Sequence, residues 1–168
     1  MSCNKFWPIL VLSWAYSLSA FAENQPATKP IITLASARAA VSSTARQAPA
    51  GRAPFVISVV DDGGHLIYLE RSDGVASGMV EASIQKAKAA ALYGFTTKAL
   101  EQQIVQGHPG FHNLPEILPM EGGVPVLMDG KLAGAVGVAG GLSSDNGEFA
   151  EKTAAAMATH RAKPLVHH

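Results

Sequence analysis

The stretch FVISVVDDGGHLIYLE, residues 55–70, decides the fold. Its first half, from Phe55 to Asp61, is an almost continuous apolar and β-branched run, which is typical of a strand covered on both faces. Asp62-Gly63-Gly64 then offers the left-handed backbone positions of a tight turn, and His65 to Glu70 returns as an antiparallel partner. The sequence therefore predicts a β-hairpin whose first strand lies inside a sheet.

A second hairpin is predicted toward the carboxyl end, where residues 124–128 and 131–139 flank the turn pair Asp129-Gly130. Pro125 favours an edge position for the first of these strands, because proline cannot donate a hydrogen bond to a neighbouring strand. The second strand presents one face of very small residues, Ala135, Gly137 and Ala139. Another group can therefore approach its backbone closely on that face.

Helices are predicted around these hairpins. The first begins at a Thr33 cap and runs to Ala45, and Pro49-Ala50-Gly51 ends it. Two more are predicted over residues 80–93 and, starting at Thr96 or Thr97, up to residue 107. A terminal helix begins at the capping pair Asp145 and Glu148 and reaches Ala158. The order helix, two strands, two helices, two strands, helix indicates an antiparallel sheet with helices on its faces.

The helix over residues 80–93 has an apolar stripe and a second row of residues on nearly the opposite side. Val80, Ile84, Ala87 and Ala91 form one, and Ala82, Lys86, Ala89 and Tyr93 form the other. We expect one row to contact the sheet and the other to contact a neighbouring subunit or a ligand.

Residues 107–123 are rich in glycine and proline and are predicted to form a long irregular loop, a kind of segment that often carries function. His108 and His112 lie close together in it, and imidazole ligates haem iron, zinc and copper. Pro109 and Gly110 between them argue against a shared helical face. Two interpretations stay open: solvated loop histidines, and a single iron ligand of haem, which needs only one protein ligand.

Composition excludes several classes of function. The chain has 13 basic and 13 acidic residues, so nucleic acid is not an expected partner. Phosphate-loop, zinc-protease and nucleophile-elbow patterns are missing from the sequence, and the glycines at 134, 137 and 140 lie in a strand rather than before a helix. Only 15% of residues are charged, which suggests that another subunit covers part of the surface.

The amino end reads as a secretory signal peptide over residues 1–22. Lys5 precedes an apolar stretch from Phe6 to Leu18, and Ala20-Phe21-Ala22 suits signal peptidase. The stretch is shorter than the roughly 20 apolar residues of a membrane span. Cys3, the only cysteine, would leave with the signal. We expect residues 23–32 to be a flexible lead-in, residues 33–168 to form a single domain, and the mature protein to be periplasmic or secreted.

The remaining polar candidates have competing structural interpretations. Asp61, Asp62 and Asp73 are typical of turns, whose carboxylates bond nearby amides, and His65 flanks the first turn. Thr97 most simply caps a helix, whereas Lys86 could meet a ligand carboxylate or extend along the surface. His167 and His168, at the chain end, could bind metal adventitiously or belong to an added tail.

In this order the elements resemble the GlcG/HbpS-like family of haem-binding and haem-degrading domains, which includes the carboxy-terminal domain of PduO-type proteins. The resemblance spans residues 33–158 and rests on these segments: Val59-Val60-Asp61-Asp62-Gly63-Gly64-His65-Leu66, Arg71-Ser72-Asp73-Gly74, Ile84-Gln85-Lys86-Ala87, Thr97-Lys98-Ala99-Leu100-Glu101, Gly122-Gly123-Val124-Pro125-Val126 and Gly134-Ala135-Val136-Gly137-Val138-Ala139-Gly140.

The resemblance implies an α/β (α+β) fold, a three-layer α/β/α sandwich around an antiparallel sheet of the profilin/roadblock-like kind. It also implies homo-oligomers and, in several members, tetrapyrrole binding near subunit contacts. Lys86 and Thr97 lie in family motifs near which a ligand is expected. His108 and His112 lie in a segment that varies within the family.

The first hypothesis is an exported, oligomeric haem-binding protein that stores, buffers or relays haem. In it His112 or His108 ligates iron, Lys86 lies near the propionates, and the ring packs against Tyr93, Phe111, Leu114 and the small-residue face. The second is an enzyme or accessory of small hydroxy-acid or aldehyde metabolism, against which stands the lack of a recognisable nucleophile, metal triad or redox motif. A third is a non-catalytic interaction module. No catalytic residue is assigned.

Overall fold

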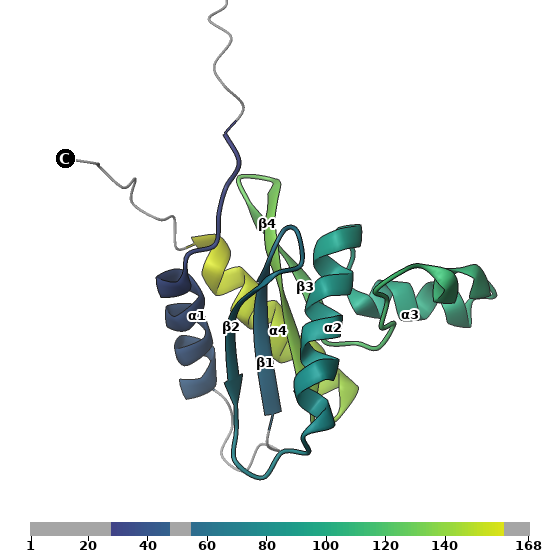
Figure 1. Ribbon diagram of the computed structural model, residues 1–168, viewed down its shortest axis with the longest axis horizontal. Helices are drawn as coiled ribbons and strands as arrows, with labels where there is room; N and C mark the ends of the chain where they lie inside the picture. The colour runs from purple at the N-terminus through teal and green to yellow at the C-terminus, as the bar shows by residue number, and fades with distance from the viewer. Residues whose placement is uncertain (1–27, 48–54, 160–168) are drawn as a thin grey trace, which may run out of the picture.

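The computed structural model describes residues 28–47 and 55–159 (Figure 1). The predicted signal peptide, the helix-ending segment Pro49-Ala50-Gly51 and the two terminal histidines lie outside the described residues. Within the described part of the chain, no helix combines the length and apolarity that crossing a membrane requires.

The described strands form one four-stranded antiparallel sheet in the order β2-β1-β4-β3. Its strands are β1 (Phe55–Asp61), β2 (Leu66–Arg71), β3 (Gly123–Met128) and β4 (Lys131–Gly140). Both predicted hairpins are confirmed. β1 is a central strand with five consecutive buried residues, and β3, which contains Pro125, lies at an edge as predicted.

Helices cover both faces of the sheet and give the expected α/β/α sandwich (Figure 1). α1 (Leu34–Arg46) and α4 (Ser143–Thr159) pack on one face, where Ile57, Phe149 and Met157 belong to the larger apolar core. α2 (Gly78–Tyr93) covers the other face.

Local capping explains where the helices begin and end. Thr33 caps α1, its hydroxyl accepting from the Ser36 amide at 3.1 Å, and Gly94 ends α2 with a left-handed backbone, φ 68°. The predicted Asp145 cap is wrong, because α4 begins earlier, at Ser143, and Asp145 lies inside its first turn.

The small-residue face of β4 is covered by α2. A Cβ atom on Gly137 would overlap the Ser83 carbonyl oxygen and lie 2.6 Å from the Ala87 amide nitrogen, both in α2. Ala135 also packs against Ala87 in a small apolar cluster. The expectation that a haem ring packs against this face is therefore wrong: the close approach that its small residues permit is made by the protein's own helix.

An arm, residues 97–119, extends from the body beside α2 (Figure 1). It contains α3 (Thr97–Val105), the short 3₁₀ helix η1 (Pro109–Asn113) and the loop after it. The predicted irregular loop is thus partly helical, because proline is well accommodated in the first turn of a helix, where its missing N–H costs nothing.

The described end of the lead-in packs on the body. Residues 28–33 form neither helix nor strand, yet Ile32 is buried in the larger core and Lys29 pairs with Asp62. The body therefore includes Ile32.

We expect Gly137→Ala to destabilise the protein by about 1–3 kcal/mol or more, because the added methyl group forces α2 away from β4. Urea unfolding measures the effect. Gly78→Ala is the matched control: that glycine begins α2 with open space around it, so alanine should leave the stability unchanged or raise it by up to about 1 kcal/mol. Equal effects of the two changes would contradict the close approach.

Candidate functional site

The arm carries an open pocket of about 390 Å³, lined by His108, Gly110, Phe111 and Leu114. The lining is almost entirely apolar, and the imidazole of His108 is the polar group among its side chains. Its volume lies within the roughly 300–1,000 Å³ of small-molecule sites. The pocket can therefore hold part of an apolar ligand and offer it one nitrogen base.

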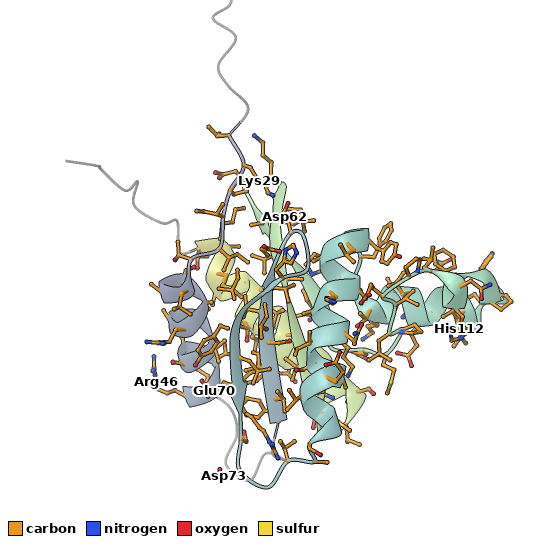
Figure 2. The ribbon with its side chains drawn as sticks, viewed as in Figure 1. Lys29, Arg46, Asp62, Glu70, Asp73 and His112 are labelled. Atoms are coloured by element: carbon orange, nitrogen blue, oxygen red, sulfur yellow. The ribbon has the colours of Figure 1, made fainter. Side chains whose placement is uncertain are left out.

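His108 and His112 have different surroundings. His108 immediately precedes η1 and lines the pocket, and its Nδ1 lies 3.3 Å from the Gln103 carbonyl oxygen. His112 lies within η1, exposed on the arm and outside the pocket lining (Figure 2). Of the two histidines, only His108 lines the pocket together with Phe111.

Tyr93 fixes the loop that follows the pocket. It is the last residue of α2, and its hydroxyl donates to the Pro115 carbonyl at 2.6 Å. Five residues earlier in α2, Lys88 pairs with Glu116 at 3.2 Å, and Glu116 has a left-handed backbone, φ 57°. Tyr93 is not part of the pocket lining; it holds the arm against α2.

Lys86 is buried beneath the arm, only 3% exposed. Its ammonium group donates to the Glu121 carbonyl at 2.9 Å and to the Val138 carbonyl at 3.2 Å. Burial lowers the pKa of Lys86, and the negative charges of Glu101 and Glu121 oppose that shift. Of the two interpretations of Lys86, extension along the surface is wrong.

Thr97 is fully buried, and its hydroxyl joins two backbone groups. It donates to the Met120 carbonyl at 2.7 Å and accepts from the Gly123 amide at 2.8 Å. The prediction that Thr97 caps α3 is wrong, because the cap is Thr96, whose hydroxyl accepts from the Ala99 amide. A single residue separates the two roles, and only packing distinguishes them.

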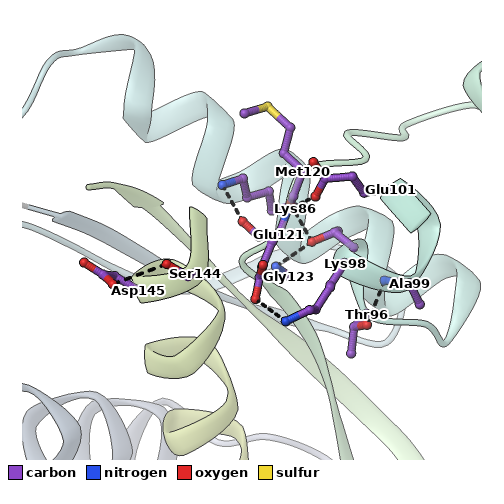
Figure 3. A network of polar contacts seen from close by, with 11 residues as sticks. Lys86, Thr96, Lys98, Ala99, Glu101, Met120, Glu121, Gly123, Ser144 and Asp145 are labelled. Atoms are coloured by element: carbon purple, nitrogen blue, oxygen red, sulfur yellow. Dashed lines mark hydrogen bonds and ion pairs between the residues drawn. The ribbon is translucent and has the colours of Figure 1, made fainter. Parts of the chain in front are cut away.

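Both residues belong to a root cluster, which we define as Lys86, Thr97, Lys98, Glu101 and Glu121 (Figure 3). Glu121 is held at three points: its amide donates to Glu101 at 3.1 Å, its carbonyl accepts from Lys86, and its carboxylate pairs with Lys98 at 2.9 Å. The cluster joins both ends of the arm to the body.

Sequence reasoning missed Lys98, Glu101 and Glu121. Lys98 and Glu101 stood in a segment that carried the family resemblance, and their spacing along α3 was the available signal. Their common partner, Glu121, lies 20 or more residues further along the chain.

The turn residues have structural roles. One Asp61 carboxylate oxygen accepts from the amides of Gly63 and His65, as predicted. Asp73 is exposed in the turn after β2.

Within residues 28–47 and 55–159, no group of three His, Cys, Asp or Glu side chains could hold a metal ion. A histidine of the arm could still bind the iron of haem, which needs only one protein ligand.

A family model described as "Haem degrading protein HbpS-like" matches residues 32–155. The chain belongs to the HbpS-like family. Its match covers the sheet, the root cluster and the arm, and includes nearly every residue of the described fold.

Individual relatives and solved structures are also similar to this chain. Protein GlcG of Escherichia coli K12 is 39% identical over 111 residues, 66% of this chain and 83% of GlcG. The crystal structure of Klebsiella pneumoniae ORFY superposes with a TM-score of 0.74 at 25% identity, over 82% of this chain and 98% of ORFY. A haem complex of PduOC superposes with a TM-score of 0.63 at 25% identity, over 73% and 90% of the two chains.

We expect Thr97→Val to destabilise this HbpS-like chain by about 1–3 kcal/mol, because the buried Gly123 amide loses its acceptor. Thr97→Ser keeps the hydroxyl and loses one methyl group, so it should cost only about 1 kcal/mol. Urea unfolding of both variants measures the difference. Valine as stable as serine would show that the hydroxyl does not hold the arm's root.

Lys86 should make the unfolding free energy depend on pH. In the unfolded chain the pKa of this lysine is near 10.5, and burial lowers it in the folded protein. Between the folded and the unfolded pKa, the unfolded chain binds more protons. The free energy of unfolding therefore rises with pH in this range. Other groups also titrate there, so the quantity to follow is the difference in stability between the wild type and Lys86→Met.

That difference should move in favour of the wild type as pH rises through this range. Lys88→Met, a change to the same residue type one half-turn along α2, reports the effect of losing a lysine whose side chain is 33% exposed. A Lys86→Met difference that does not change with pH would contradict the burial of a charged Lys86.

Proposed function

We propose that this protein is an exported, oligomeric haem-binding protein that stores, buffers or relays haem. The observation that carries the proposal is the apolar pocket on the arm, with one histidine among its lining residues. Membership of the HbpS-like family supports it, as does the similar fold of PduOC, whose crystal structure is a haem complex.

The residues of the pocket fit the requirements of haem. Haem is a flat apolar ring that needs apolar walls and one axial protein ligand. Phe111 and Leu114 provide such walls, and the histidine provides a nitrogen base. Bound there, haem would supply an iron centre, while the protein's own residues hold the ring and restrict the access of water. The root cluster and Tyr93 keep these walls in place.

Homo-oligomer formation is part of the proposal, because the pocket is open and large apolar side chains of the arm and of its two ends are exposed. Phe95, Val105 and Met120 are 57%, 82% and 47% exposed, on or beside the arm. Large exposed apolar groups close together mark surfaces that associate with a partner. A second copy covering the arm would bury them and give the pocket its missing wall.

Export rests on the sequence of residues 1–22, with its basic start, short apolar stretch and small residues at the predicted cleavage site. Cleavage there would remove Cys3, the only cysteine. The exported protein would then contain no thiol, which suits a haem carrier outside the cytoplasm, since a thiolate is reactive and is itself a haem ligand.

We expect hemin to shift its Soret absorbance saturably when titrated into the purified protein, and Leu114→Ala to weaken binding about tenfold because an apolar wall is lost. Leu142→Ala is the matched control, since Leu142, just before α4, is 71% exposed and lies outside the pocket lining. Its affinity should equal that of the wild type.

Sedimentation of the same samples reports their assembly, with and without hemin. The absence of a saturable shift in the wild type would contradict haem binding. Equal weakening by both leucine changes would show that hemin adheres to apolar surface in general and not to the pocket.

A further inference from the structure

We infer that His108, and not His112, ligates the iron, through Nε2, and that the backbone carbonyl of Gln103 sets the tautomer and orientation of its ring. The inference rests on the proposed function and adds to it the identity of the ligand atom and the residue that positions it. It follows from the position of His108, from the end of α3 and from the hydrogen bond of Nδ1.

Position separates the two histidines. His108 lines the pocket, together with the apolar surfaces of Phe111 and Leu114. Both histidines are exposed, but His112 lies on η1, outside the lining (Figure 2). An axial ligand must reach the iron at the centre of a ring held by the pocket walls. Only His108 lies among those walls.

The end of α3 determines where His108 lies. The Gly107 amide donates to the Ile104 carbonyl at 3.1 Å, and the His108 amide donates to the Gln103 carbonyl at 3.0 Å. With Gly107 left-handed at φ 97°, this pair of bonds is a Schellman motif, a common way for helices to end. His108 is the residue that this motif ties back to the helix, so its backbone is fixed by a local and sequence-encoded structure.

The same carbonyl also binds the side chain. His108 Nδ1 lies 3.3 Å from the Gln103 oxygen, which already accepts from the His108 amide. A carbonyl oxygen can only accept, so this contact requires a proton on Nδ1. In neutral imidazole the other nitrogen, Nε2, then carries the free lone pair. The structure thus provides the tautomer that can ligate iron through Nε2.

This arrangement matches the general pattern of metal-binding histidines, which usually donate their second ring N–H to a carbonyl or carboxylate. Gln103 is among the last four carbonyls of α3, where the helix dipole places partial negative charge. A proton donated toward that charge makes Nε2 a better electron donor. The expected outcome is a histidine already oriented before any ligand enters.

Two measurements test the inference. The first uses the protein without haem: long-range ¹⁵N–¹H NMR correlations distinguish the Nδ1–H from the Nε2–H tautomer, and the His108 signals are assigned by their loss in His108→Ala. We expect the Nδ1–H tautomer for His108. The Nε2–H tautomer would overturn the orienting role of Gln103, whether or not the protein binds haem.

The second measurement compares hemin complexes by absorbance, electron paramagnetic resonance and resonance Raman spectroscopy. We expect His108→Ala to lose the histidine-ligated spectrum and to weaken hemin binding by about tenfold or more, and added imidazole to restore the spectrum. His112→Ala is the matched control, the same change four residues along the arm, and should keep both the spectrum and the affinity.

Gly107→Ala tests the positioning of His108 without removing the ligand. Alanine is strained at φ 97°, so the Schellman motif should loosen and the iron–histidine signal should shift or broaden. Gly74→Ala introduces the same kind of strain, at φ 78°, in a turn after β2 with open space around it, and should leave the signal unchanged.

The outcomes separate the inference from the proposed function. A wild type that binds no hemin overturns both. A wild type that binds hemin, with the histidine spectrum lost in His112→Ala and kept in His108→Ala, overturns the inference alone. A spectrum that survives both changes also overturns it, because the iron would then be held by another residue.

Discussion

The positions of Lys86 and of the arm depend on how closely α2 approaches β4. Gly137 has no side chain, so the helix backbone around Ser83 and Ala87 lies directly on the strand. Lys86 lies beside Ala87 in α2. Because the helix is so close to the strand, the Lys86 ammonium group reaches the Val138 carbonyl of β4 and the Glu121 carbonyl just before β3. A larger residue at 137 would move α2 outward and pull the ammonium group from both acceptors. The packing of one helix on one glycine thereby places the residues that hold the arm.

The arm combines a fixed root with an open pocket. Its two ends meet at the root cluster, where the buried Thr97 hydroxyl, the buried Lys86 ammonium group and the half-buried Glu101 carboxylate all bind backbone atoms near Glu121. Beyond the root the arm is tied to α2 mainly through Tyr93 and Lys88, and its own apolar side chains remain partly exposed. The root cluster is rigid, and the apolar surface of the arm is only partly covered. A site that is completed by a ligand and a second subunit requires both properties. Lys86 and Thr97 thus support the pocket from below rather than line it.

Sequence patterns predicted the fold well because they depend on neighbouring residues. The apolar run of β1, the Gly94 stop and the Asp129-Gly130 turn each act through local backbone preference, and all are present in the structure. The site was predicted less well. Thr96 and Thr97 are adjacent and chemically identical, yet the first caps α3 and the second binds the Met120–Gly123 segment. The glycines of β4 correctly indicated a close approach, but what approaches, α2, follows only from the packed layers.

The sequence by itself determined the sheet, the helices that cover it, the HbpS-like family and the Schellman motif that Gly107 permits before His108. Those features arise from periodicity, turn chemistry and contacts within a few residues. Only the tertiary structure decided that Lys86 is buried, that Glu121 gathers its partners from α2 and α3, and that His108 rather than His112 lines the pocket. The physical reason is distance along the chain. A hydrogen bond between residues 20 to 52 positions apart exists only after the layers have packed, and no local pattern records it.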